Sequence, residues 1–162
     1  EPSIVEKCLD DLVNHEGRIA FKNSDSALKF AFAYAKCQNV HWGGAECVVR
    51  WEILARTLRI ALERGIIKEN DFYMEDEQVL RKISINGNID IGMNLDLLAK
   101  RRLNLRENLD NPQYKLKKKF RYIDPHYLNN GRLHRLSESK RYEAFLDEQR
   151  KKNEKGINVD II

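Results

Sequence analysis

The side chains best suited to chemistry in this sequence are lysines and arginines interleaved with aromatic residues in the C-terminal half. Residues 114–122 read YKLKKKFRY. Ammonium and guanidinium groups neutralise phosphates, and aromatic rings stack on bases. The run therefore predicts phosphate or other anion binding by four cations, Lys117, Lys118, Lys119 and Arg121.

The same residues fit a second interpretation that needs no ligand. Apolar Leu116, Phe120 and Tyr122 are interleaved with the cations. This spacing predicts a strand over residues 114–124. Lysines on an edge strand oppose strand-to-strand aggregation. Edge protection and anion binding both remain open on the sequence alone.

Positive charge is concentrated in one region of the chain. Residues 100–121 contain nine Lys and Arg against two Asp and Glu, whereas residues 1–99 contain 12 against 16. The formal net charge of +4 therefore conceals a local basic patch. A local patch indicates an anionic partner. One hypothesis is a nucleic-acid-binding or nucleotide-binding module that uses the patch Lys100–Arg121.

No known catalytic or metal-binding motif accompanies this patch. The four histidines are far apart, none begins an HExxH or HxH pattern, and the three cysteines form no CxxC pair. Glycine-rich phosphate loops are also missing from the sequence. We therefore predict no catalytic residue, no metal ligand and no cofactor in this chain itself.

Cysteine usage favours a cytoplasmic protein. Cys8, Cys37 and Cys47 fall in predicted helices, where a reduced thiol behaves as a small apolar side chain. The first residues are acidic and amphipathic, unlike a signal peptide. No apolar run approaches the roughly 20 uncharged residues of a membrane span, so we expect no membrane partner.

One long apolar segment is expected to organise the fold. Residues 45–67, AECVVRWEILARTLRIALERGII, carry apolar side chains on more than one helical face and no Gly or Pro before Gly65. A helix that is apolar on several faces is expected to be buried. Several of its polar side chains are arginines, so Arg50 is a candidate for contact with a bound anion.

Shorter elements are expected around this helix. Capping and periodicity signals predict helices over residues 3–14, 24–40, 75–83, 94–103 and 137–152, and a strand over 157–162. The predicted fold class is mainly α, a multi-helix bundle with a long buried central helix and a small C-terminal β element. We expect a helical domain over residues 1–103 and a basic α+β module over 104–162, packed as one compact unit.

Several segments resemble the HD-domain phosphohydrolases, a metal-dependent family that includes deoxynucleoside triphosphate hydrolases. Residues 18–42, RIAFKNSDSALKFAFAYAKCQNVHW, are similar to the stretch after that family's last metal ligand. Residues 45–67, with the acidic FYMEDEQVLRKI that follows, resemble its long helix and the next acidic helix. Residues 120–138, FRYIDPHYLNNGRLHRLSE, resemble a C-terminal module of some bacterial members and form the most specific part of the resemblance.

The resemblance implies a scaffolding role. The family holds its metal with a set that includes an adjacent His-Asp pair, and no histidine in this sequence is followed by Asp. We therefore expect the C-terminal scaffold fragment of a phosphohydrolase that acts on a nucleotide or other phosphate ester. The fragment would be inactive by itself, with a divalent metal only in the full-length parent. Lys36, His41 and Arg50 would then face a phosphate.

A third hypothesis assigns the chain no small ligand. A helical protein-interaction domain could form a homo-oligomer through apolar surface that is left exposed. These three hypotheses, the phosphohydrolase fragment, the nucleic-acid or nucleotide module and the interaction domain, belong to different functional classes.

Overall fold

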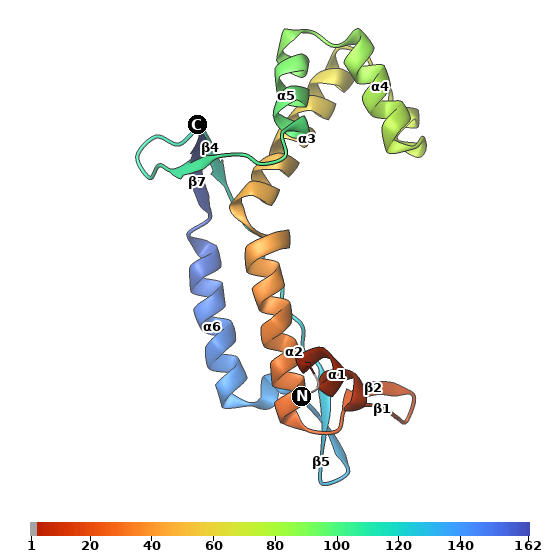
Figure 1. Cartoon of the computed structure of the whole chain (residues 1–162), viewed down its shortest axis with the longest axis vertical. Helices are drawn as coiled ribbons and strands as arrows, with labels where there is room; N and C mark the ends of the chain where they lie inside the picture. Colours follow the sequence, from red (N-terminus) through yellow and green to blue (C-terminus); the bar gives the residue numbers. More distant parts are fainter. Residues whose placement is uncertain (1–2) are drawn as a thin grey trace. The chain divides into compact units, whose positions relative to one another are not determined.

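The computed structural model describes residues 3–162, which form two compact units (Figure 1). Of the described residues, unit 1 comprises 3–44 and 117–156, and unit 2 comprises 45–116 and 157–162. Each unit is therefore built from two stretches that are far apart in sequence. The domain boundary expected at residue 103 falls inside unit 2.

Unit 1 contains a four-stranded sheet in the order β1-β2-β5-β6. Its strands are β1 (Leu12–His15), β2 (Arg18–Phe21), β5 (His126–Asn129) and β6 (Arg132–Arg135). The outer pairs are antiparallel hairpins, and β2 and β5 pair in parallel with Phe21 opposite Tyr127. This parallel pairing joins the two stretches of chain that make unit 1.

Two-residue turns close both hairpins. Glu16 and Gly17 have φ of 51° and 77°, and Asn130 and Gly131 have φ of 49° and 74°. Positive φ at both central residues matches the twist of the flanking strands, and Asn-Gly is the sequence most typical of such a turn. These hairpins were not predicted from the sequence, although Asn130-Gly131 carries the signal.

The helices of unit 1 pack beside this sheet. They are α1 (Ile4–Asp10), α2 (Ser24–Cys37) and α6 (Lys140–Glu154), with the short π-helix η1 (Gln38–Trp42) and the short 3-10 helix η3 (Leu136–Glu138). Ser3 caps α1 and forms the predicted capping box with Glu6. In the core, the rings of Phe32 in α2 and Phe145 in α6 have centroids 4.7 Å apart.

Unit 2 combines helices with a three-stranded antiparallel sheet. The helices are α3 (Ala45–Glu63), η2 (Glu69–Tyr73), α4 (Asp76–Asn86) and α5 (Ile89–Ala99). The strands, in sheet order, are β3 (Leu105–Glu107), β7 (Ile157–Ile161) and β4 (Tyr114–Leu116). The predicted C-terminal strand is thus confirmed, and it lies in the middle of the sheet.

Two apolar clusters hold unit 2 together. One joins α3 to the sheet and contains the buried side chains Val49, Ile53, Leu103, Tyr114, Ile157 and Val159. The other joins α3, α4 and α5 and contains Ala61, Ile67, Val79, Ile83 and Ile91. Because α3 contributes to both, it is the element that links the sheet of unit 2 to its other helices.

The prediction of a mainly α bundle is wrong. The described chain is 56% helical and 17% strand, and its strands form two sheets, so the fold is mixed α and β. The missed strands have only three or four residues. A strand that short shows too little alternation to be recognised. The first predicted helix is too long for the same reason. Its last residues, 12–14, belong to the short strand β1.

The expectation that the central helix is buried on several faces is also wrong. The helix forms as predicted, but its fully buried side chains, Val49, Ile53, Thr57 and Ala61, repeat every four residues along one face. Trp51 on another face is 52% exposed. The contacts of α3 within unit 2 are mainly with α5 and β4.

Substitutions in α4 test the core of unit 2. Ile83 is fully buried, whereas Ile85 in the same helix is 69% exposed. We expect Ile83→Ala to lower the free energy of unfolding by about 2–5 kcal/mol, because it leaves a cavity among packed side chains. Ile85→Ala serves as the control and should change it by less than about 0.5 kcal/mol. Urea denaturation measures both, and equal effects would contradict the described packing.

Candidate anion-binding site

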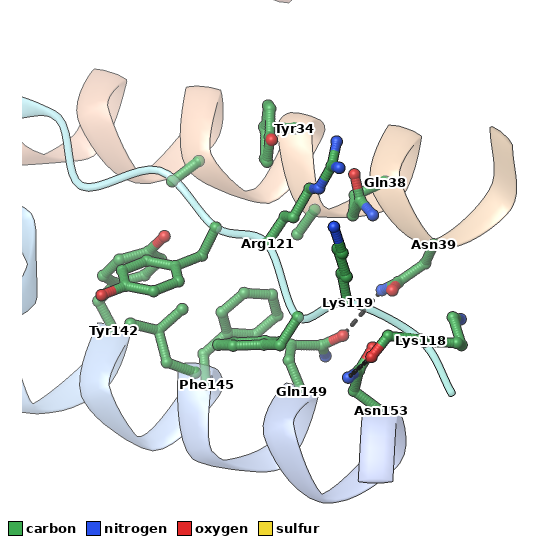
Figure 2. A pocket seen from close by; sticks show the side chains of 15 residues that line it. Tyr34, Gln38, Asn39, Lys118, Lys119, Arg121, Tyr142, Phe145, Gln149 and Asn153 are labelled. Atoms are coloured by element: carbon green, nitrogen blue, oxygen red, sulfur yellow. Dashed lines mark hydrogen bonds between the residues drawn. The ribbon is translucent and has the colours of Figure 1, made fainter. Parts of the chain in front are cut away.

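A narrow cleft in unit 1 lies between α2, α6 and the segment that follows β4 (Figure 2). Its polar lining residues are Tyr34, Gln38, Asn39, Lys118, Lys119, Arg121, Tyr122, Tyr142, Gln149 and Asn153. Ala31, Ala35, Phe120, Phe145 and Leu146 complete the walls. All of these residues belong to unit 1.

Side chains of α6 hold the backbone of residues 117–125. Asn153 donates from Nδ2 to the Lys118 carbonyl at 2.8 Å, and Tyr142 donates from its hydroxyl to the Ile123 carbonyl at 2.5 Å. The two carbonyls thus accept from side chains of α6 and not from the backbone of a neighbouring strand. The predicted strand therefore ends at Leu116. The edge-strand interpretation is wrong for Lys117, Lys118 and Lys119, which lie outside any strand, whereas Lys115 does lie on the edge strand β4.

The aromatic side chains of this segment already have partners within unit 1. Phe120 and Tyr122 stack with ring centroids 5.5 Å apart, and the Arg150 guanidinium lies 5.5 Å from the centre of the Phe120 ring. Phe120 also packs against the core of unit 1. Stacking on a base is thus open only to Tyr122, which is 46% exposed.

The cleft has cationic groups and no carboxylate in its lining. Lys119 and Arg121 are exposed, and Lys118 is half-buried. Within residues 3–162, none of these three side chains forms an ion pair. Burial lowers the pKa of the Lys118 ammonium. The electrostatic character of the cleft is therefore positive and uncompensated.

Gln38 forms the opposite wall of the cleft, at the start of the π-helix. The Gly43 amide donates to the Gln38 carbonyl at 2.6 Å and closes the widened turn. A Cβ at Gly43 would lie 2.8 Å from Gln38 Nε2, and one at Gly44 would collide with the Val40 carbonyl. The Gly-Gly pair is thus required by this close approach. π-turns of this kind often occur at functional sites.

The enclosed part of the cleft is small. Its volume is about 20 Å³, which is room for one water-sized group. A whole nucleotide does not fit inside, so a larger ligand would bind across the mouth, where Lys119 and Arg121 are exposed.

The structure brings together three of the seven residues that the sequence singled out. Lys118, Lys119 and Arg121 line the cleft, whereas Lys36, His41 and Lys117 are exposed elsewhere on unit 1. Arg50 belongs to unit 2 and has structural partners there. Its guanidinium donates to Glu46 and to the carbonyls of Leu98 and Lys100.

The basic patch Lys100–Arg121 is likewise divided. Residues up to Leu116 belong to unit 2, and those from Lys117 belong to unit 1. Arg106 in unit 2 is paired with Asp160, at 3.7 Å between Nη2 and Oδ2. The patch is continuous in sequence, but its residues are divided between the two units.

Most polar residues of the cleft were missed by the sequence analysis. Gln38, Asn39, Gln149 and Asn153 are uncharged, and nothing in their spacing indicates a site. They come together because Asn39 in η1 donates to Gln149 in α6 at 2.8 Å, across 110 residues of sequence. The Gly43-Gly44 pair was the one available signal of an irregular turn.

A divalent metal site needs several His, Cys, Asp or Glu side chains that converge. Within residues 3–162, no three His, Cys, Asp or Glu side chains converge as ligands would. His134 instead pairs with Glu138, at 2.8 Å between Nδ1 and Oε2.

A second surface is an apolar groove in unit 2, of about 740 Å³. It is lined by Leu54 of α3, by Glu77, Leu80, Arg81 and Ser84 of α4, and by Leu95, Leu98 and Ala99 of α5. The only charged groups in this lining are Glu77 and Arg81, and neither has an ion pair within the described part of the chain.

Comparison with protein-family profiles, curated proteins and solved structures gave no match to this chain. Among the described residues, no helix combines the length and the apolar character that crossing a membrane requires.

The stability of the protein at alkaline pH tests the buried hydrogen bond that the Tyr142 hydroxyl donates to the Ile123 carbonyl. Burial raises the pKa of the Tyr142 hydroxyl to about 12, from 10.0. The unfolded chain therefore ionises first, so the contribution of this group is complete below pH 10 and is lost as pH rises to 12. A pKa difference of two units between the folded and unfolded states corresponds to about 2.7 kcal/mol in the free energy of unfolding.

We expect urea denaturation of the wild type to show this loss between pH 10 and 12. Tyr142→Phe should be less stable at pH 7 by about 1–3 kcal/mol, because the Ile123 carbonyl loses its donor. The stability gap between the two proteins should then narrow above pH 10. A gap that is constant with pH would contradict the burial of this hydroxyl.

Proposed function

We propose that this chain binds a phosphate-bearing ligand, a nucleotide or other phosphate ester, at the cleft of unit 1. We further propose that it does so as the non-catalytic C-terminal part of an HD-type phosphohydrolase. The observation that carries the first proposal is the group of unpaired cations, Lys118, Lys119 and Arg121, around a cleft without carboxylates. Like charges held on neighbouring residues repel, and a bound anion removes that repulsion.

The position of the cleft supports the link to the phosphohydrolase family. Tyr34, Gln38 and Asn39 come from residues 18–42, and Arg121 and Tyr122 come from residues 120–138. These are two of the segments that carry the sequence resemblance. If the resemblance reflects descent, the two segments are expected to cooperate in holding substrate phosphates.

The missing ligand set restricts what the chain contributes. Because no His-Asp pair is present and no metal-ligand group converges among residues 3–162, bond cleavage is assigned to the full-length parent. The parent would carry the divalent metal. The role proposed for this chain is to bind and orient the phosphate.

Removing two cations of the cleft tests the binding proposal. We expect ATP to bind the wild type in calorimetric titrations, and Lys119→Gln with Arg121→Gln to weaken binding by about 10- to 100-fold, since each loses a charge-assisted hydrogen bond. Arg59→Gln, an exposed cation of unit 2, is the matched control and should bind as the wild type does.

Three outcomes would contradict this function. Unchanged ATP affinity in the double variant would remove the cleft as the site. Manganese-dependent hydrolysis of ATP by these 162 residues alone would contradict the non-catalytic role. Tight binding of single-stranded DNA with a steep salt dependence, and none of ATP, would favour the nucleic-acid module instead.

A second candidate function is self-association through the groove of unit 2. Glu77 and Arg81 have opposite charge and lie four residues apart on α4, at the edge of an apolar groove. In a two-fold contact, Glu77 of each copy would meet Arg81 of the other, so this surface is complementary to itself. A second copy of the chain is therefore the occupant that we propose.

Light scattering over a range of protein concentrations tests self-association. We expect the wild type to shift from monomer to dimer as concentration rises, and Leu80→Asp to remain monomeric, because it places a charge in the groove. Ile85→Asp lies on the same helix outside the groove lining and should still dimerise. A wild type that is monomeric throughout would exclude this function.

A further inference from the structure

Gln38 carries a hydrogen-bond acceptor that the protein leaves without a donor. Its side-chain oxygen Oε1 is buried and has no hydrogen-bond partner within the described chain. The residue as a whole is 9% exposed and lines the cleft. A buried acceptor without a donor is unfavourable, and native proteins contain few of them. This oxygen is therefore suited to accept a hydrogen bond from a ligand.

The size and charge of the cleft restrict what that ligand can be. The enclosed volume of about 20 Å³ admits one group of the size of a water molecule or a hydroxyl. Figure 2 shows Lys119 and Arg121 extending from their segment toward the helix that carries Gln38. The ligand must therefore present one small donor beside a negative charge.

A hydrogen phosphate combines both properties. Its P–OH group is a hydroxyl donor, and its remaining oxygens accept from ammonium and guanidinium groups. Sulfate and phosphodiesters are anions without this hydroxyl at neutral pH. We propose that the cleft selects a protonated terminal phosphate, with the P–OH donating to Gln38 Oε1 and the anionic oxygens bound by Lys119 and Arg121.

This inference rests on the proposed function and narrows its ligand to phosphate monoesters. An anion site made of cations alone would accept sulfate and diesters as readily. The Gln38 oxygen weakens the binding of sulfate and of diesters, because neither supplies a hydrogen-bond donor and the oxygen stays desolvated without a partner. We expect a preference of about 10- to 100-fold for the protonated monoester.

The dependence on pH follows from the ligand. The second proton of a phosphate monoester dissociates near pH 6. No histidine or carboxylate lines the cleft, and its titratable groups are Tyr34 of α2, Lys118, Lys119, Arg121 and Tyr122 of the segment, and Tyr142 of α6. The preference should therefore decline between pH 5 and 8.

The test uses the full chain with three probes: AMP, cyclic AMP, which is a diester without a P–OH, and sulfate. At pH 5.5 we expect AMP to bind about 10- to 100-fold more tightly than cyclic AMP or sulfate. Gln38→Met has a similar length but no oxygen, and it should bind all three with about equal affinity. Gln149→Met, another amide of the cleft, is the control and should keep the preference.

The outcomes separate this inference from the proposed function. If the wild type binds all three probes equally, or if Gln38→Met keeps the preference for AMP, the role of Gln38 is wrong and anion binding stands. If none of the probes binds, the proposed function itself is wrong. Should Gln38→Met fail to fold, the wild type still decides, because a preference that does not change from pH 5 to 8 overturns the inference.

Discussion

The hydrogen bonds between α6 and the backbone of residues 117–125 are the constraint on which unit 1 depends. Asn153 and Tyr142 are 11 residues apart in a helix, a distance of about 16 Å. Their acceptors, the carbonyls of Lys118 and Ile123, are five residues apart, which is also about 16 Å in an extended chain. The segment is therefore extended along the helix without being part of a sheet. Extended backbone alternates its side chains, so Lys119 and Arg121 fall on one side.

The sequence was most informative where a local signal determines structure. The capping box of Ser3 and Glu6, the long helix after Gly43-Gly44 and the strand over 157–162 each have a signal in adjacent residues, and all three are present. The fold class was not predictable in the same way. The strands of unit 1 have only four residues each, and the pairing that joins the two hairpins, Phe21 with Tyr127, connects residues more than 100 positions apart.

Only the cationic side of the cleft was predictable from the sequence. Its cations are visible in the sequence because Lys118, Lys119 and Arg121 lie in one short run. Its amide-bearing wall was not visible, because Gln38 becomes special only through burial and through a π-turn. For Arg50 the sequence pointed to a site that the structure does not form. An arginine on a long apolar helix predicts anion binding, but the Arg50 guanidinium donates to Glu46 and to two backbone carbonyls.

The discontinuous composition of the two units has a consequence for biosynthesis. When residues 45–116 leave the ribosome, unit 2 still lacks β7, the middle strand of its sheet. Unit 1 lacks β5 and β6 until residue 135 has been made, and α6 until residue 154. The cluster that joins α3, α4 and α5 can pack at that stage, whereas the cluster between α3 and the sheet waits for β7 and the core of unit 1 waits for α6. Nascent chains therefore expose the apolar side chains of these two clusters until α6 and β7 have been made.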